Sequence, residues 1–529
     1  MGFSQAEQME QYVTTQLTKW VGAVPLVLPI LKRLQVAEIV DEHCRGKEQV
    51  PHGTVVSALA LNRLMAPQPL YKVGEWLGDT ILEDALDVEA EQLYDSRLGR
   101  TLDDIHPQLA AIWEEIVVQA VVQYNIDLSQ VHYDITSIYF EGAYDASETI
   151  DYGYSRDQRP DAKQRNLGLN VTGQDGIPLA YRVLAGRTAD RTTPLENMQA
   201  LQQLLERAHQ VAPARDFLLV SDRAMLDPSV LLAYQAQGVA WLGPLAADGS
   251  LRAVLPSVSH EELDAQPLDY RPRSQPADEP PRYYGSLRRA TVEQDGQAVP
   301  LQLLVVKSHG KLKLDRQRRA TYLQRLTERL DDIQGMLNTR KYKRKAYAQQ
   351  QIDKACQGNP AQHVEIELTG SDGNLPLAYR LNEQKLAEAE ALDGRYLLGT
   401  NQHDLGAHQM LRRFKRQEVI ERRIKTIKGP VALRPLFLHN EERIEGLVFV
   451  SMLALLLYTI LEMLCRRAGH HITARHVLET FERLGAIYLP FADGSWLKVA
   501  SALTDAQRHL LELLRFPPPA SYWHRPAGP

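Results

Sequence analysis

The order of strand-like and helix-like segments between residues 131 and 245 constrains the fold of this chain more than any other feature of its sequence. The segment VHYDITSIYFEG, at 131–142, is rich in β-branched and aromatic residues and predicts a strand. The segments NLGLNVTG and IPLAYRVLAG flank Asp175-Gly176, a tight-turn signal, and predict a β-hairpin. An amphipathic helix, an apolar strand that ends on Asp222, a second helix and the short strand VAWLGPL follow.

This succession of three strands, a helix, a strand, a helix and a strand is the pattern of an RNase H-like core. We therefore expect an α/β fold in which an RNase H-like mixed sheet is flanked by helices. Segments before residue 128 carry apolar residues at three- and four-residue spacing, which predicts a helical N-terminal domain. Residues 246–395 interrupt the pattern with a Pro- and Asp-rich linker, strands and a long helix. They predict an α+β insertion before the late basic helix at 411–428.

A chain of 529 residues is too long for a single hydrophobic core, so several domains are expected. The N-terminal helices are compatible both with a module that binds DNA ends and with a bundle that makes no DNA contact. The expected regions are a helical N-terminal domain (1–128), a first part of the core (129–245), an insertion subdomain (246–395), a second part of the core (396–470) and a C-terminal helical tail (471–529).

Positive charge is concentrated in two segments of a chain whose formal net charge is −6. Residues 311–345 contain twelve basic and four acidic side chains, and residues 411–428 contain eight basic and two acidic ones. The net charge argues against a general nucleic-acid binder, whereas such local clusters are the usual footprint of phosphate binding. The two segments are therefore candidate DNA contacts.

Cysteine usage and hydropathy predict a cytoplasmic protein without a membrane segment. The three cysteines, Cys44, Cys356 and Cys465, are too scattered for a disulfide framework or a zinc site. The N-terminal segment MGFSQAEQMEQYV is acidic and lacks the apolar stretch of a signal peptide. The apolar run at 447–461 has 15 residues, fewer than the roughly 20 that span a bilayer, so we expect a buried core helix.

Two aspartates lie within or at the end of predicted strands. Asp134 lies in the middle of the first strand, where a carboxylate is unfavourable unless it is paired or binds a metal. The structural alternative is an edge-strand residue bonded to a neighbouring turn. Asp222 ends an apolar strand, a position from which α/β proteins often present functional groups to a crevice, although aspartate also caps helices there.

A third acid lies in the basic segment at 411–428. If this segment is one helix, its 3- and 4-residue spacing places five side chains near one face: Phe414, Gln417, Glu421, Lys425 and Lys428. An apolar stripe beside that face would anchor the helix to the sheet; it consists of Ile420, Ile424 and Ile427. Glu421 would then border the core, while Glu418 is expected to be a surface ion-pair partner.

Three converging carboxylates could hold two Mg²⁺ ions, or Mn²⁺ in their place, as phosphoryl transfer on nucleic acids requires. Asp134, Asp222 and Glu421 are the predicted ligands. His132, on the same strand face as Asp134, is a weaker candidate. The surrounding Lys and Arg side chains would bind the DNA phosphates that the acids repel.

The second basic segment mixes cations with aromatic rings. Tyr342 and Tyr347 are interleaved with basic residues, a mixture that can grip phosphates and stack on exposed bases. A solvated helix face is an equally good explanation. The candidate DNA contacts of this segment are Arg340, Lys341, Lys343 and Arg344.

The arrangement around the third acid resembles the DDE transposases of bacterial insertion sequences, in particular the insertion-sequence-four-like group. That group carries Tyr-x2-Arg-x3-Glu-x6-Lys, and this chain has Phe414-x2-Gln417-x3-Glu421-x6-Lys428. YDITSIYFEG and VSDRAML resemble the first and second Asp blocks of the family. LDGRYLLGTN and LRPLFLHNEERIEGLVFVSMLALLL extend the resemblance on either side of Glu421.

The resemblance implies a transposase that binds the terminal inverted repeats of its element, cleaves there and joins the 3′ ends to target DNA. It implies Asp134, Asp222 and Glu421 as metal ligands, Lys428 as a DNA contact, and a homodimer on DNA associated with the nucleoid. Gln417, Arg422 and Lys425, from the same basic segment, are further candidate DNA contacts. The first alternative is an inactive or domesticated relative that binds DNA without cleaving it, because Phe414 and Gln417 depart from the signature. The second is an RNase H-like nuclease without strand transfer.

Overall fold

The computed structural model describes residues 17–46, 48–145, 147–211, 217–272, 275–276, 278–433, 438–490 and 496–523. Three expectations fall partly outside these ranges: the N-terminal segment, the part of the resemblance at 434–437 and the end of the tail. The chain forms two compact units. The first unit comprises Met1–Met225 and Arg416–Pro529, and the second comprises Leu226–Lys415.

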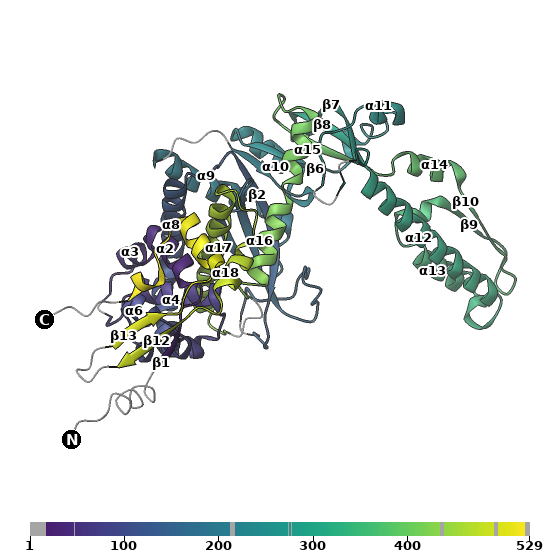
Figure 1. The fold of residues 1–529 in the computed structure, drawn as a ribbon. Helices are drawn as coiled ribbons and strands as arrows, with labels where there is room; N and C mark the ends of the chain where they lie inside the picture. The colour runs from purple at the N-terminus through teal and green to yellow at the C-terminus, as the bar shows by residue number, and fades with distance from the viewer. Residues whose placement is uncertain are drawn as a thin grey trace, which may run out of the picture. The chain divides into compact units, whose positions relative to one another are not determined.

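The first unit begins with the predicted helices, whose apolar residues are buried. They are α2 (Val24–Arg33), α3 (Val36–His43), α4 (His52–Met65), α5 (Val73–Gly78), α6 (Leu82–Leu86), α7 (Asp95–Ile105) and α8 (Leu109–Tyr124). In α8 the spacing of Ile112, Ile116 and Ala120 keeps one side of the helix buried. These helices pack beside a mixed sheet within the same unit (Figure 1).

The sheet of the first unit has the strand order β4-β3-β2-β5. Its strands are β2 (Gln130–Tyr139), β3 (Gln164–Thr172), β4 (Pro178–Ala185) and β5 (Leu218–Val220). β3 is antiparallel to both β2 and β4, whereas β2 and β5 are parallel. The predicted turn at Asp175-Gly176 joins β3 to β4, and Gly176 adopts φ +66°. α9 (Pro194–Val211) leads from the hairpin to β5. The predicted mixed sheet flanked by helices is therefore present.

The apolar run at 447–461 lies within α17 (Glu441–Arg467). By length and composition this helix could cross a membrane, but 94% of its most apolar 18-residue window is buried. It contacts α2, α4, α7 and α16 as well as β4, and the labels of α2, α4 and α16 lie around it in Figure 1. α17 is thus the core helix that the sequence predicts, shared by the N-terminal helices and the sheet.

The C-terminal segment is not wholly helical, which differs from the prediction. Between α18 (Ala474–Phe481) and α19 (Asp505–Leu514) lie two strands, β12 (Gly485–Pro490) and β13 (Trp496–Ala500). β12 pairs with β13 on one side and with β1 (Leu17–Trp20) on the other. The partner strand comes from the opposite end of the chain, so local sequence patterns did not reveal the sheet.

The second unit contains a fully antiparallel set of strands in the order β6-β11-β8-β7. Their bounds are Ala240–Leu245 for β6, Tyr283–Gln294 for β7, Gln297–Ser308 for β8 and Arg395–Thr400 for β11. The turn between β7 and β8 uses positive φ at Asp295 and Gly296, which suits a tight hairpin. Three helices accompany these strands: α10 (Pro228–Ala236), α11 (His260–Asp264) and α15 (Ala407–Lys415).

A helical part of the second unit has a core of its own. It contains α12 (His309–Met336), α13 (Lys345–Ala355), α14 (Glu383–Ala391) and the hairpin β9 (Val364–Leu368)–β10 (Leu377–Leu381). An apolar stripe that runs along α12 and its C-cap, formed by Leu326, Leu330, Ile333 and Leu337, is buried in this core. Tyr322 packs against it at the margin.

The predicted helix at 411–428 is two helices instead of one. α15 ends at Lys415, in the second unit, and α16 (Glu418–Lys428) belongs to the first unit. α15 buries Met410 and Leu411, whereas α16 buries Val419 and Ile420, so each segment packs into the core of its own unit. Phe414 therefore does not share a helical face with Glu421.

Candidate active site

The parallel pairing of β2 with β5 places the two aspartates side by side. His132 pairs with Val220, and Asp134 and Asp222 each follow two residues beyond this pair. Because parallel strands run in the same direction, both acids reach the same edge of the sheet. Asp134 is partly buried, and its Oδ1 accepts a hydrogen bond from the backbone N–H of Ile135 at 2.7 Å.

The pKa of the Asp134 carboxyl reflects its proximity to Asp222. Burial raises the pKa of the Asp134 carboxyl, and the negative charge of Asp222 raises it further, to about 7. The guanidinium of Arg156 acts in the opposite direction. Two carboxylates so close together destabilise one another's charge, and a bound cation would relieve that repulsion.

Glu421 shares a cleft with Asp134. The cleft has a volume of about 430 Å³, and the lining also includes Asp157, Lys425 and Lys428. α16 contacts both β2 and β3, and Glu421 is exposed on the side of α16 that faces the cleft. Asp134 and Glu421 therefore line one space.

Gln417 connects Asp222 to the start of α16. Its side-chain Nε2 donates a hydrogen bond to Asp222 Oδ1 at 2.5 Å. Gln417 is the N-cap residue of α16, one turn before Glu421. The predicted DNA contact at this position is thus engaged with the second acid, which it helps to orient.

The buried stripe of α16 differs from the predicted one. Ile420 and Ile427 are fully buried, but Ile424 is only partly buried and lines the cleft. Arg423 occupies the buried position instead, with 1% of its surface exposed. The signal was available in the sequence, because helical spacing places residue 423 between 420 and 427 on one face.

Arg423 is held by three partners inside the first unit. It forms an ion pair with Glu462 of α17 at 2.5 Å and donates hydrogen bonds to the backbone oxygens of Asp175 and Gly176, at 2.7 and 3.1 Å. A Cβ on Gly176 would lie 2.5 Å from Val419 Cγ1, so the turn approaches α16 as closely as it does only because this residue is glycine. These contacts fix α16 against the hairpin and α17.

The basic side chains of α16 differ in their surroundings. Lys425 is exposed and Arg422 is partly exposed. The Lys428 ammonium lies 2.7 Å from Asp157 Oδ1, and both side chains are largely buried, with 9% and 5% exposed. Lys425 is therefore the most accessible cation on the cleft side of α16.

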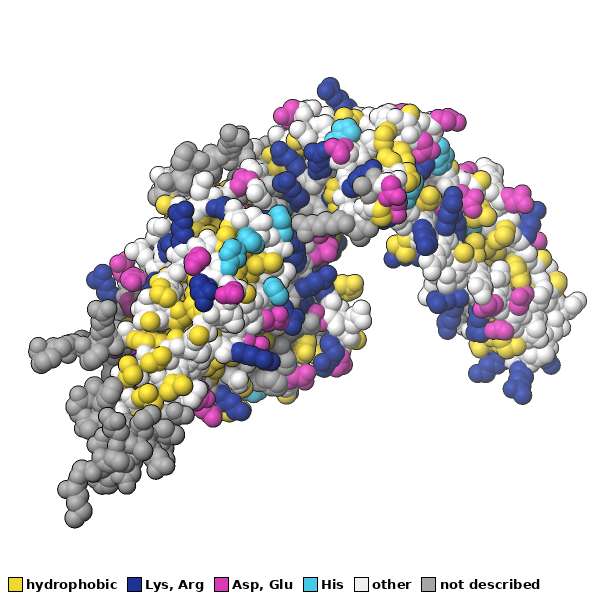
Figure 2. Space-filling model, viewed as in Figure 1, with side chains coloured by type: hydrophobic (Ala, Val, Ile, Leu, Met, Phe, Trp, Pro, Cys, Tyr) yellow, Lys and Arg dark blue, Asp and Glu magenta, His cyan; other side chains and the backbone are white. Residues whose placement is uncertain are grey.

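The other predicted DNA contacts belong to the second unit. Arg340, Lys341, Lys343 and Arg344 are all exposed, at the short helix η7 (Arg340–Lys343) and the start of α13. On the face drawn in Figure 2, Lys and Arg side chains gather along the helical part of this unit. Tyr342 and Tyr347 pack edge to face, with ring centroids 5.1 Å apart, and Tyr342 also packs against the core. Both rings have protein partners, in contrast to the predicted base-stacking role.

His132 is a buried residue of the sheet. Its Nε2 lies 2.8 Å from Gln130 Nε2, and burial, together with the charge of Arg416, lowers the pKa of His132 to about 3. The imidazole is fully inaccessible to solvent. These surroundings explain His132 as a core residue.

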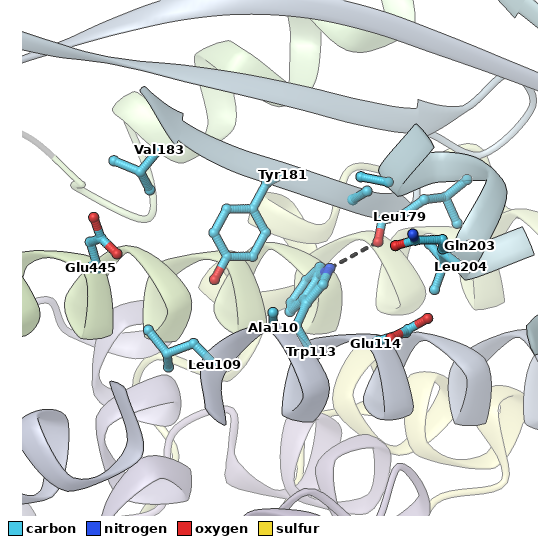
Figure 3. Close-up of a pocket in the computed structure, with 12 residues that line it drawn as sticks. Leu109, Ala110, Trp113, Glu114, Leu179, Tyr181, Val183, Gln203, Leu204 and Glu445 are labelled. Carbon is cyan, nitrogen blue, oxygen red and sulfur yellow. Dashed lines mark hydrogen bonds between the residues drawn. The ribbon is translucent and has the colours of Figure 1, made fainter. Parts of the chain in front are cut away.

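A second cavity of the first unit, about 280 Å³, lies among α8, α9, β4 and α17 (Figure 3). Trp113 and Tyr181 form its centre, and Trp113 Nε1 donates to the backbone oxygen of Leu179 at 2.8 Å. The two acids at its margin are paired, Glu114 with Arg207 and Glu445 with both His106 and Arg165. This cavity is mainly apolar and lacks the converging acids of the cleft.

Comparisons with known proteins give a family match over part of the chain and several similar solved structures. Residues 16–118 match a family described as "Domain of unknown function (DUF4277)". No curated protein matches the chain.

One similar structure is the piggyBac transposase in a synaptic complex with hairpin DNA: 7% identity, 87% of this chain and 78% of that chain covered, and a TM-score of 0.40. The Mos1 transposase is similar in a pre-cleavage transpososome, with 15% identity and a TM-score of 0.16, and in a paired-end complex with the left transposon end, with 14% and 0.15. Each Mos1 alignment covers 38% of this chain and 60% of the Mos1 chain. These identities and TM-scores are too low to support a functional argument, so the evidence for function is the geometry of the site.

Proposed function

We propose that this protein is a DDE-type DNA transposase of the insertion-sequence-four-like group, built on an RNase H-like core. It binds the terminal inverted repeats of its element, cleaves the DNA strands there and joins the 3′ ends to target DNA. The proposal is supported by two pairs of acids that share Asp134. Asp134 and Asp222 lie two residues beyond a paired position of the parallel strands β2 and β5, and Glu421 lines the same cleft as Asp134.

The donor set fits a pair of hard divalent cations. The described residues that line the cleft offer carboxylate oxygens and neither thiolate nor imidazole, which favours Mg²⁺, or Mn²⁺, over zinc. Asp134, Asp222 and Glu421 would hold the two ions. When bound, such ions activate the attacking water or 3′-hydroxyl and stabilise the leaving oxygen.

The remaining residues of the cleft position the acids and the DNA. Gln417 orients the Asp222 carboxylate through its hydrogen bond, and Lys425 and Arg422 bind phosphates that approach the acids. Lys428, held by Asp157, contributes positive charge at the wall of the cleft. Arg340, Lys341, Lys343 and Arg344 supply a further exposed phosphate-binding surface in the second unit. The partners are terminal-repeat and target DNA, and we expect a homodimer on DNA.

A test compares variants of the full-length protein on DNA fragments that carry the sequences flanking its reading frame. Asp134→Ala, Asp222→Ala and Glu421→Gln are each expected to abolish Mg²⁺-dependent strand cleavage and to leave DNA binding nearly intact. Glu418→Gln is the matched control, because this exposed carboxylate lies one turn from Glu421 on the same helix. Cleavage by the Asp134 and Asp222 variants at the unmodified rate would refute the proposed site.

The second candidate is a relative that binds DNA without cutting it. It is favoured by one observation: the position of the arginine in the family signature is occupied by Gln417, whose amide is engaged with Asp222. This candidate predicts end binding by the unmodified protein with no cleavage in either Mg²⁺ or Mn²⁺. Cleaved ends that never appear in a joined product would instead indicate a nuclease without strand transfer.

A further inference from the structure

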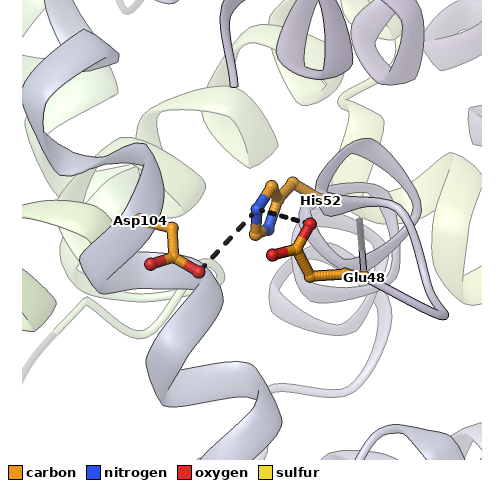
Figure 4. Close-up of side chains that lie close together, drawn as sticks. All are labelled: Glu48, His52 and Asp104. Atoms are coloured by element: carbon orange, nitrogen blue, oxygen red, sulfur yellow. Dashed lines mark ion pairs between the residues drawn. The ribbon is translucent and has the colours of Figure 1, made fainter. Parts of the chain in front are cut away.

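A histidine and two carboxylates converge in the N-terminal helical region, on elements that carry none of the three acids of the cleft. His52 begins α4, Asp104 lies in the last turn of α7, and Glu48 precedes α4. One ligand atom from each residue lies within 4.8 Å of the other two. In Figure 4 the imidazole stands between the two carboxylates.

The distances indicate a space between these groups rather than direct bonds. His52 Nε2 lies 3.6 Å from Glu48 Oε2 and 3.7 Å from Asp104 Oδ2. Both separations reach the roughly 3.6 Å at which a side-chain contact no longer counts as a hydrogen bond. Two ligand atoms on one tetrahedral ion, each about 2.1 Å from it, stand about 3.4 Å apart. The two distances from the imidazole lie within a few tenths of an ångström of that value, and the two carboxylate oxygens lie within 4.8 Å of one another.

The imidazole is held so that Nε2 points at the two acids. His52 is buried, with 4% of its surface exposed, and its Nδ1 lies 3.4 Å from the hydroxyl of Thr101, which is fully buried on α7. We assign the Nδ1 proton to this contact, which leaves the Nε2 lone pair directed between the carboxylates. A hydrogen bond at the far nitrogen is the usual way in which proteins orient a metal-binding histidine.

The carboxylates, in contrast, reach solvent. The side chains of Glu48 and Asp104 are 31% and 50% exposed. Both line a cavity of about 470 Å³, to which Glu91, Tyr94 and Arg100 also contribute. A cation bound by the three residues could therefore complete its coordination with water from this cavity.

We infer that Glu48, His52 and Asp104 form a second, structural metal site, which binds a borderline divalent ion such as Zn²⁺. One imidazole nitrogen and two carboxylate oxygens suit Zn²⁺ or Co²⁺ better than Mg²⁺. The bound ion ties the segment before α4 to the end of α7. It thereby stabilises the helical region and takes no part in chemistry at the cleft.

The experiment measures ion content in full-length protein that carries Asp134→Ala and Asp222→Ala, so that the cleft does not contribute. After dialysis against Zn²⁺ and then against metal-free buffer, elemental analysis is expected to find one ion per chain. Adding Asp104→Asn and Glu48→Gln should reduce this to near zero and remove the rise in Tm that Zn²⁺ produces. With Co²⁺ as the probe, the absorption bands of the bound ion should disappear in the same variants.

The two substitutions act on exposed side chains, so the fold should survive where His52→Ala could disturb it. Two controls accompany them. Glu91→Gln removes a carboxylate from the same cavity without touching the three ligands, and Cys44→Ser removes a thiol from the neighbourhood of Asp104. Both are expected to retain the ion. An ion content unchanged by Asp104→Asn and Glu48→Gln, or no retained ion in any variant, would overturn the inference.

Discussion

Arg423 helps to hold α16 in place, although its side chain lies on the opposite side of the helix from Glu421. It lies two residues after Glu421, on the opposite side of α16, and joins that helix to α17 and to the turn between β3 and β4. A buried guanidinium is stabilised only when its charge and its donors find partners. Glu462 supplies the opposite charge, and the two backbone oxygens accept from Nε and Nη2, so these contacts fix the rotation of α16 that exposes Glu421 to the cleft.

Arg423→Met is expected to lower the free energy of unfolding by about 3–5 kcal/mol, because it leaves Glu462 buried without its cation. The double variant Arg423→Met/Glu462→Met should recover most of this loss, since an apolar pair of similar volume fits the same space. Chemical denaturation of the four proteins of the cycle measures both effects. Arg422→Met, on the neighbouring and less buried position, is the control and should change stability by about 0.5 kcal/mol or less. Equal effects of Arg422→Met and Arg423→Met would contradict the assigned role.

At the scale of single residues, the sequence indicated candidate site residues but not the side chains that they contact. Asp134 is a candidate because a carboxylate inside a strand is unfavourable unless it is paired or binds a metal. Glu421 is a candidate because basic residues surround it in the sequence. The hydrogen bond from Gln417 to Asp222 and the ion pair of Lys428 with Asp157 join residues far apart in the chain. Such contacts depend on tertiary packing, which local spacing does not encode.

Among the elements, α16 presents two different surfaces. The inner surface carries Arg423 and Ile427, which are buried, and the outer surface carries Glu421 and Lys425. Both halves of the predicted segment are helical, but the prediction of one continuous helix was wrong, because the chain passes from one unit to the other at residues 415–416. Helical propensity does not depend on which hydrophobic core a segment packs against, so the sequence did not reveal the break between α15 and α16.

Lys425→Gln and Arg422→Gln are each expected to reduce the slope of log affinity for DNA against log salt concentration by about 0.9, the value for one lost phosphate contact. Lys428→Gln should change the slope less, because its ammonium is already neutralised by Asp157. Binding titrations at several salt concentrations provide the measurement. Arg508→Gln, an exposed cation that pairs with Asp505 on α19, is the control and should leave the slope unchanged. A slope that stays constant in the Lys425 variant would place its side chain away from the DNA.

At the scale of the whole molecule, the two units differ in whether one stretch of chain or two stretches form them. The second unit is one continuous stretch of chain with its own strands and its own helical core. The strands and the long helix of this region were predictable from their alternation and from the stripe on α12. Its boundaries were not, since β6, β11 and α15 resemble the elements of the first unit in composition.

The segment 226–415, produced alone, is expected to fold, because its helical part buries an apolar core of its own and its four strands β6, β11, β8 and β7 pair with one another. Circular dichroism should show mixed helix and strand, and urea unfolding should be cooperative. A matched segment with Leu330→Asp, a buried position of α12, provides the negative control and should lose cooperativity. Non-cooperative unfolding of the unmodified segment would show that it depends on the rest of the chain.

The first unit, by contrast, is assembled from two stretches of chain that are translated at different times. The strands that carry Asp134 and Asp222 leave the ribosome long before α16, with Glu421, and α17, which fills the core beneath them. Domains fold as their sequence becomes available, so a nascent chain holds the first two acids without the third. A protein whose synthesis stops within the second unit therefore lacks both the third of the proposed acids and the core helix α17, so the proposed active site is completed only after the second unit has been translated.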